Sequence, residues 1–324
     1  MTKQYSFTDM EYSQRRRKTK REEFLEMMEK ILPWGEWVEI VRPYYPEGKR
    51  GRKPQEIERM LRMLMLQTWF SLSDEGIEDA IYDSYAMKQF TSINFADGEQ
   101  VPDATTLCKF RKLLNDNGLQ KKMFAQISEL LSIKGKMMHG GTIVDATIVE
   151  APDSRKNAKK EPDPEMHSVK KYTQWYFGMR AHIGTDAGTG YVHHLFVTAA
   201  NVAEVKVAPE LLRADDKVVY GDAGYLKMED YVQDGIERDY RINRQLGTFK
   251  RHYGSSLGFE MEKQIETRKS SVRSKVEYVF HIVKDIFKWR KARYKGLAKN
   301  SGHAHLLFAS ANLYMCAASG GICE

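Results

Sequence analysis

Apolar and polar positions follow two different patterns along the chain, and the change falls near residue 135. In the first part, apolar residues recur every three or four positions, which is the spacing of one helix face. This pattern occurs in four segments, before Pro33 and at 55–70, 73–82 and 103–117. Ser73 and Asp103 are expected N-caps, and Gly118 is expected to end the fourth helix. The sequence therefore predicts an all-α region over residues 1–135.

From residue 141 the pattern becomes that of strands. The segment TIVDATIV at 142–149 is an apolar, β-branched run with one carboxylate, which is typical of a buried central strand. Further strands are predicted near 175–184, 191–198, 217–220 and 237–242, and helices near 205–213 and 271–290. The polar stretch 152–171 contains three prolines and is predicted to be a surface loop. These elements predict an α/β domain over residues 136–324.

The charge balance weakly indicates a polyanionic partner. The 51 lysines and arginines outnumber the 44 aspartates and glutamates, so the net charge is +7. Nucleic acid is the commonest polyanion in a cell, although ribosome-associated and membrane-surface proteins share this balance.

Basic side chains gather in two N-terminal stretches and on one helix. The clusters at 15–21 and 49–53 are either solvated or in contact with phosphates. In the helix at 103–117, polar positions lie mostly away from the apolar stripe. A helix that enters a DNA groove has this pattern, and so has a plain surface helix. The side chains of these segments that we expect to contact DNA are Arg15, Arg16, Arg17, Arg52, Lys53, Thr105, Thr106, Lys109 and Arg111.

Nothing in the sequence predicts secretion, a membrane span or a metal-binding cysteine motif. Cys108, Cys316 and Cys323 form no CxxC pair. The N-terminus has no apolar signal region, and no run of about 18 apolar residues occurs. We therefore expect a cytoplasmic protein without a membrane partner.

Two aspartates stand at positions that suit a ligand site. Asp145 interrupts the apolar run at 142–149, and a carboxylate buried there needs a pairing partner or a metal ion. Asp222 follows the strand at 217–220, beyond the carboxyl end of that strand, where α/β sheets commonly bind ligands. An aspartate that only caps the next turn would occupy the same position.

The helix predicted at 271–290 has a basic strip beside an apolar arc. At roughly 100° per residue, one face carries Ser270, Arg273, Glu277, His281 and Lys284. The apolar residues of the helix fall on a separate arc that is expected to pack on the sheet. A salt-bridged surface helix would show the same pattern.

Three carboxylates from different elements suit Mg²⁺, which prefers hard oxygen ligands. We expect Asp145, Asp222 and Glu277 to hold two Mg²⁺ ions, with Mn²⁺ as a substitute. Two such ions about 4 Å apart can drive an in-line displacement at phosphorus. Arg273 and Lys284 would then grip the DNA backbone near the scissile phosphate.

Two other groups of side chains offer alternatives. His182, His193 and His194 could form a zinc site, but their alternation with apolar strand residues favours structural histidines. The aromatic residues at 175–177 could stack on bases, and core packing is the favoured interpretation.

Taken in order, these motifs resemble those of bacterial insertion-sequence transposases of the IS-five type, within the DDE superfamily. The resemblance covers nearly the whole chain. It rests on PDATTLCKFRKLL (102–114), TIVDATIVEAP (142–152), FGMRAHIGTDAGTGYVH (177–193), TAANVAE (198–204), VVYGDAGY (218–225) and the spaced Arg273, Glu277 and Lys284. Related families have a tyrosine three positions before the arginine, where this chain has Ser270.

The resemblance implies a ribonuclease H-like α/β core, a mixed sheet with flanking helices, in which Asp145, Asp222 and Glu277 are the catalytic triad. It implies cleavage of double-stranded DNA at terminal inverted repeats and joining of the 3′-hydroxyl ends to target DNA. A homodimer or larger synaptic complex in the bacterial nucleoid is expected. The alternatives are a nuclease that cuts without joining and a DNA-binding regulator that has lost catalysis. The three retained carboxylates speak against the regulator.

Overall fold

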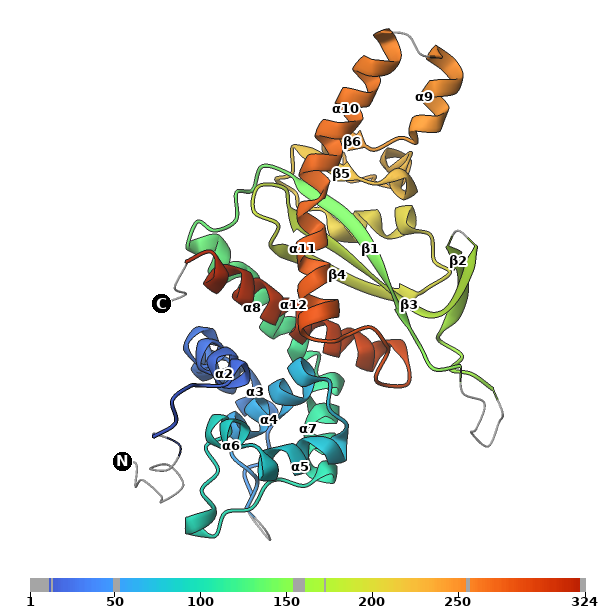
Figure 1. Ribbon diagram of the computed structural model, residues 1–324. Helices are drawn as coiled ribbons and strands as arrows, with labels where there is room; N and C mark the ends of the chain where they lie inside the picture. The colour runs from blue at the N-terminus through green and yellow to red at the C-terminus, as the bar shows by residue number, and fades with distance from the viewer. Residues whose placement is uncertain are drawn as a thin grey trace. The chain divides into compact units, whose positions relative to one another are not determined.

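The computed structural model (Figure 1) describes residues 12, 14–48, 53–153, 161–171, 173–254 and 257–320. Contacts within the chain group it into two compact units. One is Met1–Asn117 with Cys316–Glu324, and the other is Gly118–Met315. The helix α8 (Leu119–Ile133) thus belongs with the second unit, and the boundary near residue 135 stays a prediction.

The first unit is built from helices. They are α2 (Lys20–Ile31), α3 (Trp34–Val41), η1 (Arg42–Tyr44), α4 (Ile57–Phe70), α5 (Asp74–Asp83), α6 (Tyr85–Phe90), η2 (Phe95–Asp97) and α7 (Ala104–Asp116). The two predicted caps are confirmed. Ser73 Oγ accepts the backbone N–H of Gly76 at 2.9 Å, and Asp103 Oδ1 accepts that of Thr106 at 2.7 Å. The core is centred on α4, in which every residue from 60 to 69 is buried.

In the described part of the chain, the second unit contains one mixed sheet of six strands. They are β1 (Thr142–Glu150), β2 (His167–Lys171), β3 (Gln174–Asp186), β4 (Val192–Ala199), β5 (Val218–Gly221) and β6 (Asp239–Ile242). The central strand β1 pairs antiparallel with β3 and parallel with β5. β6 extends the sheet beyond β5, while β2 and β4 both pair with β3. The α/β class is confirmed, and the arrangement is consistent with a ribonuclease H-like core.

The two faces of β1 meet different surroundings because successive side chains of a strand point to opposite sides. Val144 packs in a core with Val219 and the 3-10 helix η3 (Glu204–Leu211). Asp145 points to the other face, which α11 (Lys275–His281) crosses (Figure 1). The central strand thus carries an apolar core on one side and a carboxylate beneath a helix on the other.

Further helical elements flank the sheet. They are η4 (Ala223–Tyr225), η5 (Met228–Asp230), α9 (Leu246–Tyr253), α10 (Leu257–Arg273), the π-helical segment η6 (Ile282–Ile286) and α12 (Leu297–Ala318). Aromatic contacts hold α12 against the end of the α11–η6 helix. The ring of Phe308 lies 6.5 Å from that of Phe280 and 6.3 Å from that of Trp289, centroid to centroid.

Two predictions about these elements are wrong, and one helix was missed. Part of the stretch 152–171 is a strand, because His167–Lys171 pairs with β3, although 154–160 lies outside the described residues. The helix expected at 271–290 begins at Leu257 as α10 and ends with η6. The helix α12 was not predicted.

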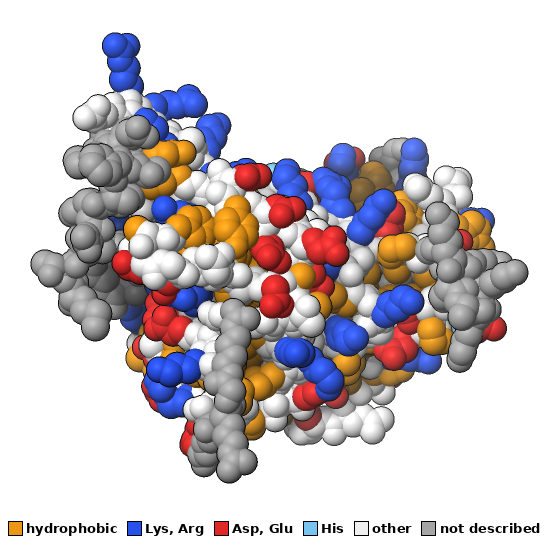
Figure 2. Space-filling model, turned by 90° about the horizontal axis from the view of Figure 1, so that it is seen from below, with side chains coloured by type: hydrophobic (Ala, Val, Ile, Leu, Met, Phe, Trp, Pro, Cys, Tyr) orange, Lys and Arg blue, Asp and Glu red, His pale blue; other side chains and the backbone are white. Residues whose placement is uncertain are grey.

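Charges of both signs are mixed on the face that Figure 2 shows. Lys and Arg side chains are interspersed there with Asp and Glu side chains, so that face carries no single large basic surface. Among the described residues, no helix is both long enough and apolar enough to span a membrane.

Candidate active site

Asp145 is a buried carboxylate on the central strand, with 13% of its side chain exposed. Burial raises its pKa to about 6, the charge of Asp222 acts in the same direction, and Arg273 opposes the shift. Oδ1 of Asp145 accepts the backbone N–H of Ala146 at 2.7 Å. The surrounding positive charge therefore does not fully offset the cost of burying this carboxylate.

Arg273, the last residue of α10, connects Asp145 to Glu277. Its Nη1 donates to Oδ2 of Asp145 at 2.8 Å, and its Nη2 donates to Oε1 of Glu277 at 3.1 Å. Glu277 lies one helical turn after Arg273, and 64% of its side chain is exposed. One guanidinium thus brings together two carboxylates that the sequence predicted to share a site.

Asp222 directly follows β5 and begins the turn η4. Its Oδ1 accepts the backbone N–H of Gly224 at 2.8 Å, a turn contact that aspartate commonly makes. The charge of Asp222 also raises the pKa of Asp145 on the neighbouring parallel strand. Asp222 therefore both caps a turn and acts electrostatically on the buried carboxylate.

Glu204 adds a fourth carboxylate that the sequence alone did not reveal. It begins η3 and forms an ion pair with Arg180 of β3 at 3.0 Å. Burial raises the pKa of Glu204 to about 7, against the effect of Arg180, and the charges of Asp222 and Asp145 raise it further. A Cβ at Gly224 would lie 2.5 Å from Oε2 of Glu204 and 3.0 Å from Oδ1 of Asp222. The lack of a side chain at that glycine lets the two carboxylates approach each other.

The donor chemistry of these residues fits a divalent cation of the magnesium type. Carboxylate oxygens are the hard ligands that such ions prefer. The pKa values of Asp145 and Glu204 are raised by burial first and by neighbouring carboxylates second, and a bound cation would favour the ionised form of both. Among the described residues, no group of three or more His, Cys, Asp or Glu side chains is arranged to hold a metal ion. Between Asp145 and Glu277 the positive charge comes from Arg273.

Comparison with protein families decides what kind of protein carries this site. The family model described as Transposase DDE domain matches residues 136–313, which is more than half of the chain. The chain belongs to the DDE transposase family. A second model, described as Transposase domain (DUF772), matches residues 13–113, so the helical region of this transposase also belongs to a transposase domain. No solved structure matches the chain. The family generally uses divalent metals, and the IS-five subtype stays a prediction.

The transposase presents its predicted DNA-contacting side chains in different ways. Exposed residues are Arg15, Arg16, Arg17, Lys53, Thr105 and Lys109, and Thr106 is half-buried. Arg111 is engaged within the fold, because it forms an ion pair with Asp74 at 2.6 Å and 12% of its side chain is exposed. Arg15 forms an ion pair with Glu22 at 2.9 Å. Arg52 lies outside the described residues.

The histidine and aromatic alternatives have separate outcomes. His182 is fully buried and its Nε2 is hydrogen-bonded to Oγ1 of Thr198 at 2.9 Å, which confirms a structural role. His193 is also buried and its Nε2 contacts Oγ1 of Thr142 at 3.0 Å. Trp175 is 66% exposed, so its assignment to the core is wrong.

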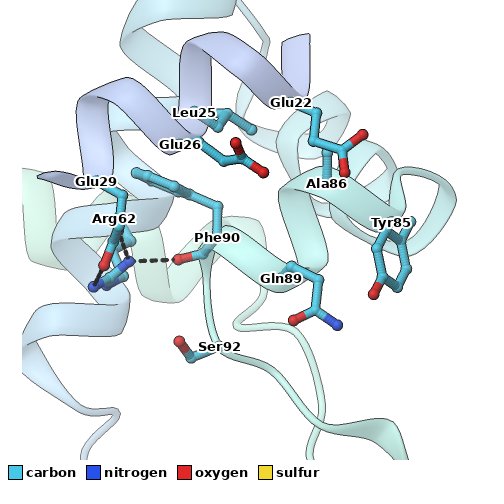
Figure 3. A pocket seen from close by; sticks show the side chains of 10 residues that line it. All are labelled: Glu22, Leu25, Glu26, Glu29, Arg62, Tyr85, Ala86, Gln89, Phe90 and Ser92. Carbon is cyan, nitrogen blue, oxygen red and sulfur yellow. Dashed lines mark hydrogen bonds and ion pairs between the residues drawn. The ribbon is translucent and has the colours of Figure 1, made fainter. Parts of the chain in front are cut away.

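The helical unit contains a pocket of about 320 Å³ that is unsuited to phosphate. Figure 3 shows Glu22, Glu26 and Glu29 around it. Its arginine, Arg62, forms ion pairs with Glu29 and Glu58 and donates to the carbonyl of Phe90, so its charge is already compensated. The acidic lining would repel a DNA backbone.

Proposed function

We propose that this transposase cleaves the inverted-repeat ends of its DNA element and joins the 3′-hydroxyl ends to target DNA, with Asp145, Asp222 and Glu277 as catalytic carboxylates. The contact of Arg273 with both Asp145 and Glu277 carries the proposal, because it joins β1 and α11 at one charged site. The influence of Asp222 on the pKa of Asp145 supports its membership of the same site.

The chemistry requires one site to serve two in-line phosphoryl transfers. Two Mg²⁺ ions, or Mn²⁺ in their place, would activate the attacking oxygen and stabilise the leaving oxygen. The chain supplies carboxylate ligands from Asp145, Asp222 and Glu277. Arg273 can contact a DNA phosphate when its carboxylate partners bind cations instead. Water attacks in the first transfer, and the 3′-hydroxyl that it leaves attacks target DNA in the second.

Glu204 is proposed as an additional carboxylate of this site. Its Oε2 and the Oδ1 of Asp222 face the same small space over Gly224. The raised pKa of Glu204 indicates that a cation nearby would favour its ionised form. Glu204 would therefore help Asp222 to attract the metal ion, while Arg180 holds the side chain in position.

The helical region is proposed to bind the terminal repeat. Its match to a transposase domain and the exposed Thr105 and Lys109 on α7 support this assignment. Joining two ends of one element requires both ends in one assembly, so we propose a homodimer or larger complex on DNA.

The test of the catalytic assignment is Glu277→Gln, which keeps the shape of the side chain and removes its charge. In a magnesium-dependent nicking assay on a labelled terminal repeat, we expect the variant to lose nearly all cleavage, since electrostatics and positioning supply most of phosphoryl-transfer catalysis. Binding of the same DNA should be at least as strong as before. Glu260→Gln is the matched control, because Glu260 is exposed on α10. Near-normal nicking by Glu277→Gln would contradict the assignment.

The alternative functions predict different products. A nuclease without strand transfer would nick the terminal repeat but would not join precut 3′-hydroxyl ends to a plasmid. A regulator without catalysis would bind the repeat and do neither.

A further inference from the structure

A basic pocket of about 390 Å³ lies at the far end of β1 in the second unit. Its lining residues are Thr147, Ile148, Glu150, Lys171, Tyr176, Lys284, Arg290 and Lys291. They come from β1, β2, β3, η6 and the segment that follows η6. Four cationic side chains and one carboxylate therefore surround one hollow.

The positive charge of this pocket is only partly compensated within the protein. Arg290 forms an ion pair with Asp285. Lys171, Lys284 and Lys291 form no ion pair with any carboxylate in the part of the chain that the structure describes. A pocket with three such ammonium groups attracts an anion.

Lys284 is the most buried of these cations. Its Nζ donates to the carbonyl oxygen of Ile148 at 3.2 Å. Burial lowers the pKa of Lys284, and the charges of Lys171 and Arg290 lower it further. An anion in the pocket would favour the charged form of Lys284, because it would offset the repulsion among the cations.

The backbone around the pocket is held in place by strand pairing. Residue Lys291 forms a parallel bridge with Glu150. The N–H of Ala292 donates to the carbonyl of Glu150 at 2.6 Å, and the N–H of Glu150 donates to the carbonyl of Arg290 at 3.3 Å. The basic side chains therefore project from a paired segment and not from a free loop.

The position of the pocket relates it to the candidate active site. Thr147 shares a face of β1 with Asp145 and lies two residues, about 7 Å, further along the strand. Lys284 lies seven residues, about 10 Å, beyond Glu277 along the helix. Both elements thus lead from the carboxylates to the pocket.

We propose that this pocket binds a backbone phosphate of the DNA strand, adjacent to the phosphate that is cut, and that Lys171 and Lys291 join Lys284 in holding it. The inference rests on the proposed function. It adds that the DNA strand runs along β1 from the cleaved phosphate to the pocket. A phosphodiester fits because it brings a negative charge without a requirement for base identity.

The test measures binding of the full-length transposase to a short duplex that carries the terminal inverted repeat flanking its reading frame. Lys171→Gln with Lys291→Gln should weaken binding roughly tenfold or more, and should reduce the slope of log affinity against log salt by about one per lysine. The matched control is Lys170→Gln with Lys295→Gln. It removes the same charge from exposed positions that lie close to Lys171 and Lys291 in the sequence and do not line the pocket.

A second measurement locates the phosphate. Single methylphosphonates, which are neutral, replace successive phosphates of the same duplex. At one position close to the cleavage site, the replacement should weaken binding by the wild-type protein and have much less effect on the double variant, because coupled partners are not additive. Equal sensitivity of both proteins at every position would overturn the proposal. If the wild-type protein neither binds nor nicks the repeat, the proposed function itself fails, which is a different result.

Discussion

At the scale of single residues, buried charge is the property that distinguishes the candidate active site. Asp145 and Glu204 both have raised pKa values because burial disfavours their ionised forms. Arg273 and Arg180 offset only part of that cost. A bound cation would stabilise the ionised form of these two carboxylates. Metal binding can therefore be measured without DNA and without cleavage.

The first prediction concerns Glu204→Gln. Removing this charge should weaken Mn²⁺ binding roughly tenfold, the loss commonly found when a residue that supports a metal site is changed. Titration calorimetry on the DNA-free protein measures it directly. Glu229→Gln, at an exposed position of η5, serves as the control. An unchanged Mn²⁺ affinity in Glu204→Gln would show that the carboxylate only anchors Arg180.

The second prediction concerns acid stability and His182. Burial lowers the pKa of His182 to about 3, below its ordinary value near 6.5. As the pH falls below about 6.5, His182 of the unfolded chain takes up a proton, whereas His182 of the folded chain does not. His182 therefore costs about 2 kcal/mol of folding free energy at pH 5. This cost grows as the pH falls further towards 3.

His182→Gln keeps a hydrogen-bonding side chain and cannot titrate in this range. Between pH 7 and pH 5, the variant should lose about 2 kcal/mol less folding free energy than the wild type in urea unfolding. The exposed His167→Gln is the control. An equal loss in His182→Gln and the wild type would contradict the lowered pKa.

At the scale of elements, the sequence predicted the helices that have one apolar face and the strands that are continuous apolar runs. The run at 142–149 became β1, and the caps Ser73 and Asp103 begin α5 and α7 as expected. The helix α12 was missed because apolar and small residues surround its whole circumference, so it shows no amphipathic stripe. Strand β2 was missed because its largely exposed side chains give no apolar alternation.

Prediction of the candidate site from the sequence has the same limit, because only residues in a distinctive local pattern were found. Asp145 was visible because a carboxylate interrupts an apolar run, and Glu277 because helical geometry isolates it on a face. Glu204 is the last residue of the motif TAANVAE (198–204), which carries part of the family resemblance, and it begins the 3-10 helix η3. Its proximity to Asp222 depends on the fold and on Gly224. The pattern of residues around Glu204 does not predict its proximity to Asp222.

The third prediction concerns the N-cap of α7. Asp103→Ala removes the acceptor for the N–H of Thr106 and should lower stability by about 1 kcal/mol, seen as a lower urea midpoint. Asp116→Ala removes the same charge at the other end of α7, where a negative charge opposes the helix dipole. That control should cost much less. Equal effects of the two substitutions would contradict the capping role of Asp103.

At the scale of the whole molecule, the excess of basic residues predicts salt-dependent DNA binding. The net charge is +7. With six or more phosphate contacts, affinity for the terminal repeat should fall by about a thousandfold or more between 50 and 200 mM salt. Fluorescence anisotropy at several salt concentrations measures the slope. A shallow slope would contradict the predicted number of phosphate contacts. Equal affinity for a scrambled duplex would contradict the proposed reading of the repeat.

The guanidinium of Arg273 acts as a counterion within the candidate active site of this transposase. It donates a hydrogen bond to each of the two carboxylates, Asp145 and Glu277. We therefore expect the chain to fold without bound metal, unlike small domains whose structure depends on a bound ion. Removing divalent ions with a chelator should therefore stop the proposed cleavage and leave the protein folded, with only the modest fall in unfolding temperature that the loss of a bound ligand causes.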